Sequence, residues 1–137
     1  MDEIKERLIK AAVEARKNAY APISNYLVGA AVLTKSGKIF TGCNVEDKSG
    51  IGITNSCAER TAIVKAISEG EREFIMVACI GGLANENPSK GAPCGACRQY
   101  LFGHNPEMII LSTNGKETNE YKLSDLLPHA FVDTFEK

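Results

Sequence analysis

The 137-residue sequence lacks any long run of apolar residues. A membrane-spanning helix needs about 20 of them in succession, and the charged N-terminal stretch lacks the basic-then-apolar pattern of a secretory signal. We therefore expect a cytoplasmic protein with no membrane partner. An excess of one charge is also missing, because 16 basic residues nearly balance 17 acidic ones. This argues against a nucleic-acid partner, since phosphates are bound by clustered positive charge, and favours a small-molecule substrate.

Repeats, low-complexity segments and internal linkers are absent as well, so residues 1–137 are predicted to form a single domain. The hydrophobic content of 44% and charged content of 24% are typical of globular proteins. Five cysteines are an odd number and are expected to be reduced in a cytoplasmic chain. Cys43 and Cys79 lie in apolar, strand-like runs, so we expect both to pack in the core.

Hydrophobic periodicity predicts an α/β protein. Apolar residues at helical spacing from Ile4 to Ala19 indicate a first helix, which ends before Pro22. The alternation of strands and helices from Lys38 to Leu111 predicts right-handed crossovers between parallel neighbouring strands. Strands are expected at 27–33, 38–46, 74–80, 108–111 and 120–123, further helices at 57–69, 94–102 and from about 124, and loops at 47–56 and 81–92.

Two cysteine clusters stand at the start of two predicted helices. One is Cys57-Ala58-Glu59, and the other is Pro93-Cys94-Gly95-Ala96-Cys97. In the predicted topology both helices begin at the carboxyl edge of the sheet, where open α/β folds bind ligands. Free N–H groups at a helix N-terminus also favour thiolates. We therefore expect Cys57, Cys94 and Cys97 to bind one Zn²⁺ and to leave the fourth, catalytic position open.

Glu59 is the expected proton carrier beside this metal. Zinc-bound water can ionise near neutral pH and attack an electrophilic carbon, and a nearby carboxylate can move the protons. Residues two apart inside a helix point in different directions, so Glu59 can face the metal only if Cys57 precedes the helix. Arg60, and also Arg98, would donate hydrogen bonds to thiolate sulfur and offset its charge.

A purely structural zinc site is the alternative. It would need a fourth ligand, and His104 is the candidate nearby, although its spacing from Cys97 matches no known zinc motif. A carboxylate close to the cysteines also favours the catalytic interpretation.

Polar side chains lie near the C-terminal end of the strand predicted at 38–46. Its period of two places Asn44 and Glu46 on one face, where an amide and a carboxylate suit the hydroxyl groups of a sugar. A solvated strand end is the alternative interpretation.

The spacing of the cysteine clusters is the signature of zinc deaminases, with Cys57 in place of the histidine that many of them carry. From the first helix to Phe131 the sequence resembles the small, homotetrameric cytidine deaminases. The matching segments are Tyr20-Ala21-Pro22, Val28-Gly29-Ala30-Ala31, Gly42-Cys43-Asn44-Val45-Glu46, Cys57-Ala58-Glu59-Arg60-Thr61-Ala62, Pro93-Cys94-Gly95-Ala96-Cys97-Arg98-Gln99 and Leu126-Leu127-Pro128.

This resemblance implies a three-layer α/β/α fold with a mixed five-stranded sheet. It also implies zinc on the three cysteines and hydrolytic deamination of cytidine or deoxycytidine in pyrimidine salvage, with Glu59 as proton shuttle. By the same resemblance Asn44 and Glu46 would hold the ribose, and the Ala58 backbone and Tyr26 ring would contact the base. Phe131 would reach a neighbouring subunit's pocket.

The sequence departs from the family around the expected substrate pocket. The loop 47–56 differs and is about two residues longer, and Ile23 replaces the usual tyrosine. A modified cytosine or isocytosine nucleoside, or an antibiotic such as blasticidin, is therefore an alternative substrate. Two further alternatives are a catalytically silent, zinc-bound nucleoside-binding protein and a nucleic-acid editing enzyme.

Overall fold

The computed structural model describes residues 2–91 and 93–131, and a five-stranded sheet forms its middle layer. The strand order is β2-β1-β3-β4-β5. The strands are β1 (Tyr26–Thr34), β2 (Ile39–Cys43), β3 (Phe74–Leu83), β4 (Ile109–Thr113) and β5 (Thr118–Lys122). The helices are α1 (Glu3–Arg16), α2 (Ala58–Ser68), α3 (Gly95–His104) and α4 (Leu123–Leu126), with a short 3₁₀ turn, η1, at Gly52–Thr54.

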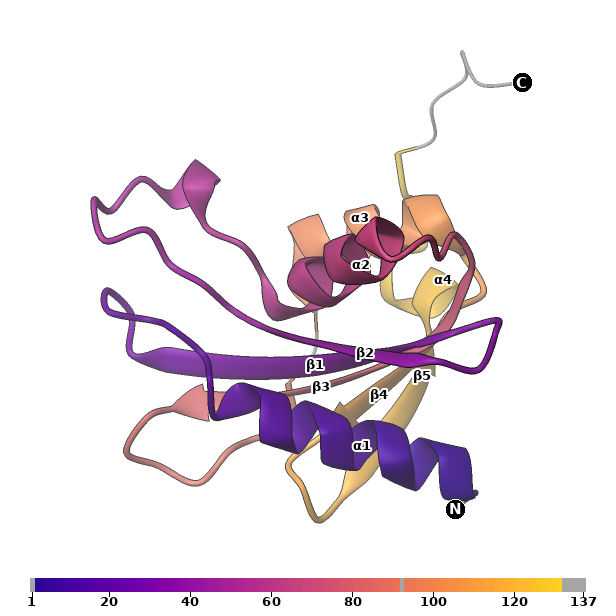
Figure 1. The fold of residues 1–137 in the computed structure, drawn as a ribbon, viewed down its shortest axis with the longest axis horizontal. Helices are drawn as coiled ribbons and strands as arrows, with labels where there is room; N and C mark the ends of the chain where they lie inside the picture. The colour runs from indigo at the N-terminus through magenta and orange to yellow at the C-terminus, as the bar shows by residue number, and fades with distance from the viewer. Residues whose placement is uncertain (1, 92, 132–137) are drawn as a thin grey trace.

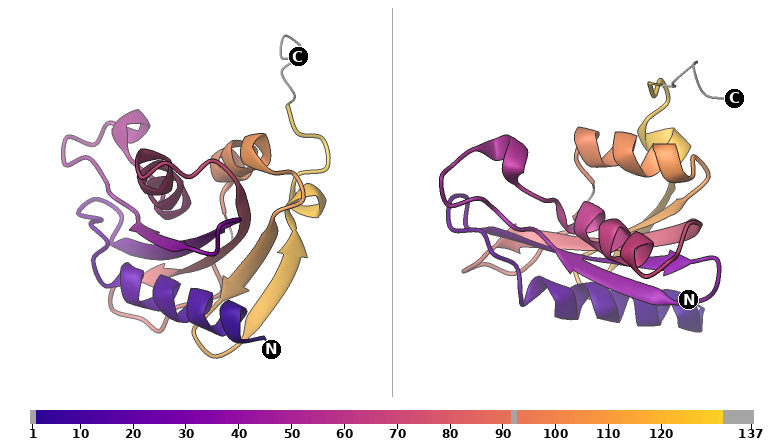
Figure 2. Two further views of the ribbon diagram at one scale, coloured as in Figure 1. Left: turned by 45° about the vertical axis from the view of Figure 1, so that its right-hand side comes forward. Right: turned by 45° about the horizontal axis from the view of Figure 1, so that its top comes forward.

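Helices cover both faces of the sheet (Figures 1 and 2). Helix α1 packs on one face, and α2, α3 and α4 lie on the other. Each face has its own buried cluster, with Leu8 and Ala12 of α1 in one and Ala62 and Ile63 of α2 in the other. The predicted three-layer α/β/α fold with a mixed five-stranded sheet is confirmed.

The position of β1 differs from the predicted topology. Strands β3 and β4 are parallel neighbours as expected, but β1 lies between β2 and β3 and is antiparallel to both. The reason is that β1 is buried over six successive residues and pairs along both of its edges, which leaves β2 at the edge of the sheet. Strands β2 and β3 still run in the same direction, so α2 and α3 both begin near the same edge.

Several element boundaries also differ. Strand β2 ends at Cys43 rather than Glu46, and Val45 beyond it forms isolated bridges to Tyr20 and Ser56. Strand β3 continues through the glycines expected in a loop, because Gly81 and Gly82 still pair with β1. Helix α3 extends past Gly103 to His104. The helix and strand near the C-terminal end were each predicted within a few residues.

The two cysteines expected in the core differ in burial. Cys79 on β3 is fully buried, which confirms the expectation. Cys43 is only partly buried because β2 is an edge strand with one side open.

Two glycines allow the helices to lie directly on the sheet. A Cβ atom at Gly42 would lie 2.4 Å from the Ala58 carbonyl oxygen, and one at Gly29 would lie 2.3 Å from the Ala12 carbonyl oxygen. Both distances are far below van der Waals contact. Gly42 thus permits the close approach of α2 to β2, and Gly29 does the same for α1 on the opposite face.

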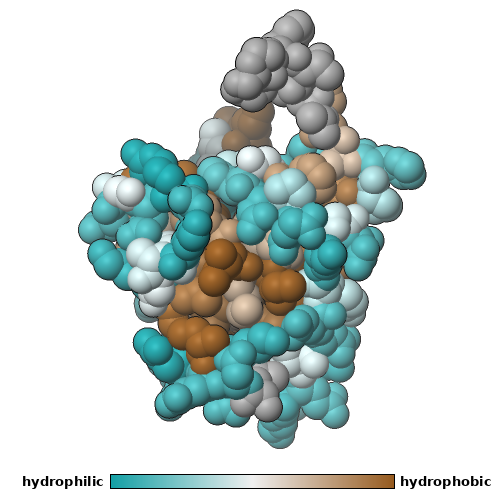
Figure 3. All heavy atoms as spheres, turned by 90° about the vertical axis from the view of Figure 1, so that its right-hand side faces the viewer, coloured by the Kyte–Doolittle hydropathy of each residue, from teal (hydrophilic) through white to brown (hydrophobic). Residues whose placement is uncertain are grey.

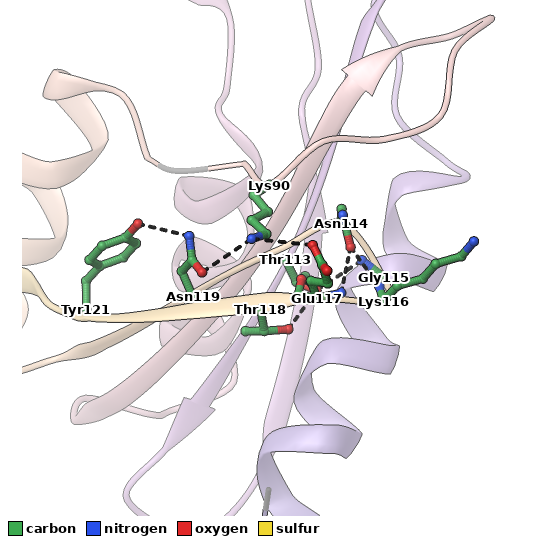
Figure 4. Close-up of polar contacts among 9 residues, drawn as sticks. All are labelled: Lys90, Thr113, Asn114, Gly115, Lys116, Glu117, Thr118, Asn119 and Tyr121. Atoms are coloured by element: carbon green, nitrogen blue, oxygen red, sulfur yellow. Dashed lines mark hydrogen bonds and ion pairs between the residues drawn. The ribbon is translucent and has the colours of Figure 1, made fainter.

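The turn between β4 and β5 is closed by its own side chains (Figure 4). The Asn114 side-chain oxygen accepts hydrogen bonds from the backbone N–H groups of Lys116 and Glu117. Lys90, from the connection between β3 and α3, reaches this hairpin and lies 3.4 Å from the Asn119 side-chain oxygen and 3.7 Å from the Glu117 carboxylate. These contacts attach the segment that leads to Cys94 to the edge of the sheet.

The surface carries an apolar patch ringed by polar side chains on the side toward which α2 and α3 end (Figure 3). The start of β3 contributes exposed apolar surface, since Ile75 is 40% exposed. Among the described residues no helix has the length and apolar character needed to cross a membrane.

Candidate metal centre

Cys57 lies immediately before α2. It is the N-cap residue, with extended backbone angles (φ −73°, ψ 154°), and the helix begins at Ala58. The backbone N–H and the hydroxyl of Thr61 both donate to the Cys57 carbonyl, at 2.9 and 3.0 Å. This is the placement that the Cys57 to Glu59 spacing required. Cys57 lies outside the helix, so its thiol need not point away from the side chain of Glu59, which lies in the first turn.

Cys94 occupies the equivalent position before α3. It is also an extended N-cap (φ −69°, ψ 174°), and the Arg98 N–H donates to its carbonyl at 2.8 Å. The Arg98 guanidinium donates to the carbonyls of Pro93 at 2.8 Å and Leu126 at 3.0 Å. Arg98 thus ties the start of α3 to α4.

The sulfur atoms of Cys57, Cys94 and Cys97 lie within 4.8 Å of one another. Tetrahedral zinc with Zn–S bonds of about 2.3 Å places its sulfur ligands roughly 3.8 Å apart, so small side-chain adjustments suffice. Cys97 is buried, Cys57 partly buried and Cys94 exposed. The donor set suits zinc, and the open side faces a cavity.

Hydrogen bonding between the thiols polarises the cluster. The hydrogen bond from Cys97 lowers the pKa of Cys57 to about 6 and raises the pKa of Cys97. The positive charge of Arg60 also lowers the pKa of Cys57. A thiolate is thereby favoured at Cys57, which is the form that binds a metal.

Glu59 is buried beside the cysteines, with only 4% of its surface exposed. Burial raises the pKa of its carboxyl group. The thiols of Cys97 and Cys79 act on this carboxyl by hydrogen bonding, although burial has the larger effect. A cavity of about 210 Å³ opens here, lined by Tyr26, Val28, Asn44, Cys57, Ala58, Glu59, Cys94 and Cys97.

Three of the four expected substrate-binding residues, Tyr26, Asn44 and Ala58, line this cavity. Glu46 is not among its lining residues and lies two positions beyond Asn44. Its carboxylate accepts hydrogen bonds from the backbone N–H groups of Ile23 and Ser24, at 2.9 and 3.0 Å. The structure therefore brings Tyr26, Asn44 and Ala58 to the cavity and leaves Glu46 outside it.

The expected arginine contacts with sulfur are replaced by contacts with backbone. The Arg60 guanidinium donates to the Asn55 carbonyl at 2.5 Å, and Arg98 donates to the two carbonyls given above. Carbonyl oxygens are strong acceptors, and the guanidinium hydrogen bonds of both arginines go to carbonyls of residues near the two helix starts and α4. Arg60 keeps an electrostatic effect on Cys57, so its role near a bound metal stays a prediction.

His104 is separate from the cysteine cluster. It lies at the C-terminal end of α3, where its ring packs edge-on against Phe74 and Tyr100, with centroids 5.4 and 5.0 Å away. Desolvation lowers its pKa. His104 is thus a packing residue rather than a fourth ligand.

Sequence reasoning missed three contributors to the site. Cys79 comes close enough to act on the buried Glu59 carboxyl, Ser24 contacts Glu46, and Gly81 lies against the ring of Tyr26. A Cβ at Gly81 would lie only 3.0 Å from Tyr26 Cε1. The signal at Gly81 was present, since a pair of glycines in an apolar strand often marks a close approach.

The comparisons with known proteins agree with this geometry. A family model described as the cytidine and deoxycytidylate deaminase zinc-binding region matches residues 2–113. The chain belongs to this deaminase family. The matched region contains all three cysteines and Glu59, so the expected zinc cofactor is confirmed at the level of the family.

Two cytidine deaminases are similar over nearly the whole chain, and a blasticidin-S deaminase is similar over about two thirds of it. A cytidine deaminase from Halalkalibacterium halodurans is 42% identical over 130 residues, which cover 93% of this chain and 94% of that protein. A crystal structure of cytidine deaminase from Burkholderia pseudomallei has a TM-score of 0.82 and 41% identity, covering 96% of this chain and 100% of that one. A blasticidin-S deaminase from Bacillus cereus is 31% identical over 94 residues, which cover 65% of this chain and 66% of that protein.

Proposed function

We propose that this protein is a zinc-dependent deaminase that hydrolyses cytidine and deoxycytidine to uridine and deoxyuridine, with release of ammonia. One observation carries the proposal: three cysteine sulfurs within 4.8 Å of one another share a cavity with a buried carboxyl group, in a chain of the deaminase family. Such a site is built for hydrolysis, because it combines a metal ligand set with a proton carrier shielded from solvent.

The cysteines and Glu59 have different roles in the proposed reaction. Cys57, Cys94 and Cys97 would hold zinc, which would supply the Lewis acidity that activates water for attack on C4 of the cytosine ring. Glu59 accepts the first proton of the attacking water and delivers it to a ring nitrogen, and it then transfers the remaining proton of the new C4 hydroxyl to the amino group, which leaves as ammonia. One water is consumed and one ammonia leaves, so no further reactant is needed.

The cavity size supports a nucleoside rather than a larger ligand. Its volume of about 210 Å³ is below the roughly 300–1,000 Å³ of sites for drug-sized ligands. The base therefore occupies the cavity, with Tyr26 and the Ala58 backbone against it. The sugar stays at the mouth, where Asn44 and Glu46 hold it. The near-zero net charge agrees with a substrate that carries no phosphate.

We further propose that the protein is a cytoplasmic homotetramer with active sites near the subunit interfaces and a role in pyrimidine salvage. Exposed apolar side chains support assembly, since Ile53 is 90% exposed and Phe131 is 76% exposed. The Gln99 side chain pairs with both backbone groups of Phe131 and so fixes its position for contact with a neighbour. Light scattering tests this assembly, and a fully active monomer would contradict it.

The decisive experiment measures ammonia release from cytidine by purified, zinc-loaded protein. Glu59→Gln should abolish turnover while zinc content stays at one ion per chain. Glu69→Gln is the matched control, because Glu69 is the exposed C-cap of the same helix. Zinc retention and nucleoside binding without any wild-type turnover would favour a silent binding protein, and salt-sensitive binding to single strands would favour nucleic-acid editing.

A cytosine analogue is the second candidate substrate. The sequence differs from the expected family pattern at Ile23 and in the loop 47–56, and similarity extends to a blasticidin-S deaminase. A panel of cytidine, deoxycytidine, modified cytosine and isocytosine nucleosides, and blasticidin S separates the candidates. Turnover of an analogue with no turnover of cytidine would replace the first candidate with the second.

A further inference from the structure

Ser24 connects the proposed sugar-binding residues to one another. It lies in the segment between α1 and β1, where Asn25 adopts a left-handed backbone conformation (φ 61°). Its hydroxyl donates a short hydrogen bond to Glu46 Oε2 and accepts one from the Tyr26 N–H at 3.0 Å. The Ser24 backbone N–H also donates to Glu46 Oε1, at 3.0 Å. One residue therefore binds both oxygens of the carboxylate.

Asn44 is attached to the same segment by its side chain. Its Nδ2 donates to the Tyr26 carbonyl at 2.8 Å, and its Oδ1 accepts from the Val28 N–H at 2.9 Å. The serine hydroxyl and the asparagine amide thus hold the two backbone groups of Tyr26. The aromatic wall of the cavity and the expected sugar-binding side chains consequently form one hydrogen-bonded unit.

The hydrogen bonds to Glu46 limit how many further hydrogen bonds its carboxylate can accept. An ionised carboxylate offers about four acceptor positions, and three of them are filled by Ile23 N–H, Ser24 N–H and the Ser24 hydroxyl. The remaining position is on Oε2, the oxygen that the Ser24 hydroxyl fixes. A carboxylate held in this way can accept one further hydroxyl without losing rotational freedom at the moment of binding.

We propose that Ser24 is a positioning residue for substrate specificity, which holds Glu46 ready to accept a single sugar hydroxyl. The inference rests on the proposed nucleoside deaminase function. Ser24 acts through Glu46 and takes no part in proton transfer at the ring, so its loss should weaken substrate binding rather than slow the chemical step.

The experiment compares Ser24→Ala with wild type on cytidine, 2′-deoxycytidine and 3′-deoxycytidine. A hydrogen bond to a charged group contributes enough free energy that its loss should raise KM for cytidine about tenfold. We expect kcat to stay within about twofold of wild type. The KM increase should vanish on the nucleoside lacking the hydroxyl that Glu46 binds. The Glu46→Gln variant identifies that hydroxyl independently. On the nucleoside that lacks it, Glu46→Gln and wild type should have the same KM.

Two variants control for structure. Ser36→Ala removes a serine-to-glutamate hydrogen bond of the same kind, 2.9 Å from Ser36 Oγ to Glu71 Oε1, in the turn between β1 and β2. It should leave KM unchanged on all three nucleosides. Ser24→Thr keeps the hydroxyl and should restore KM for cytidine to within about threefold of wild type, which a purely steric effect would not do.

The outcomes separate this inference from the function on which it rests. Wild-type turnover with an unchanged KM in Ser24→Ala would overturn the role of Ser24 and leave the deaminase function intact. An equal loss on all three nucleosides, or a loss mainly in kcat, would also overturn it, because general destabilisation has that signature. No wild-type turnover of any nucleoside would overturn both.

Discussion

Gly42→Ala should disable the metal centre by pushing helix α2 away from the sheet. An added Cβ would lie 2.4 Å from the Ala58 carbonyl oxygen and 2.5 Å from the Ala62 nitrogen, both of them backbone atoms of α2. Non-bonded carbon contacts are comfortable near about 3.5 Å. Helix α2 must therefore move away from β2 by roughly 1 Å, because neither backbone can yield locally.

The displacement moves one half of the site against the other. Cys57 and Glu59 move with α2, whereas Cys94 and Cys97 stay with α3. Misplacement of catalytic groups by about 1 Å can cost about 10²-fold in rate, which corresponds to roughly 2.7 kcal/mol of transition-state stabilisation. Overpacking should also lower the free energy of unfolding by about 1–3 kcal/mol.

Gly29→Ala provides the matched control. Its Cβ would lie 2.3 Å from the Ala12 carbonyl oxygen and 2.5 Å from the Arg16 nitrogen in α1, on the opposite face. We expect both variants to lose similar thermal stability. Gly42→Ala should also lose zinc and about 10²-fold of kcat/KM for cytidine, while Gly29→Ala should stay within about threefold of wild type.

The assays are thermal unfolding, metal analysis of purified protein, and steady-state deamination below the unfolding transition. Full zinc content and near-wild-type kcat/KM in a destabilised Gly42→Ala would refute the reasoning, because α2 would then have moved without affecting the ligands. Equal activity losses in both variants would refute it too, since they would trace to general destabilisation.

Three other changes have defined outcomes. Gly81→Ala should raise KM several-fold with little change in kcat in steady-state kinetics, because its Cβ would press on the Tyr26 ring at 3.0 Å; an unchanged KM would show that the ring is not a binding wall. Hydrogen bonds from Ser49 and Thr54 lower the pKa of Asp47 from 3.8 to about 2, so its contribution to loop order is complete above about pH 4 and is lost as the pH falls toward 2. Asp47→Ala should therefore lower the protection factors of the amides in the loop 47–56 at pH 7, whereas wild type should lose this protection, measured relative to intrinsic exchange rates, only below about pH 4; equal protection factors in the variant and wild type at pH 7 would contradict this. Gly103→Ala should raise stability by about 0.5–1 kcal/mol and Tm by roughly 2–4 °C, because it lies exposed inside α3 with open space around its Cα; a lower Tm would contradict the helical assignment.

The ligand cluster was predictable because its signal is local. The short spacings around Cys57 and Cys94, together with two helix starts, specify where the thiols emerge without detailed knowledge of the sheet. The helices were likewise evident from apolar periodicity and from Pro22. The single domain stays a prediction, as do the individual roles of Glu59 and the substrate-binding residues.

The strand order was less accessible, because it depends on which edge of β1 is occupied. Both neighbours of β1 are apolar strands. Nothing in the local pattern shows whether β2 pairs directly with β3 or is separated from it by β1. The extension of β3 through Gly81 and Gly82 was hidden for a related reason. Glycines normally weaken strands, and only the long pairing with β1 overrides that preference here.

The side-chain partners of Glu46 and Arg60 could not be anticipated either. Sequence shows that a carboxylate or a guanidinium is near the site, but several acceptors and donors then compete for it. Arg60 binds the Asn55 carbonyl, and Glu46 binds a segment more than twenty residues earlier. Such choices depend on distances of an ångström or less, which emerge only after the layers have packed.

The central place of β1 also governs how the molecule must assemble. Its pairing with β3 joins residues as distant in the chain as Ala31 and Ala78, and β4 can attach only after β3 is in place. Such non-local contacts slow folding, since a long loop closes before any of them is formed. On the ribosome Cys57 emerges well before Cys94 and Cys97, so the nascent chain carries only one of the three ligands until its second half is made. Metal capture is accordingly a late event in the maturation of this protein.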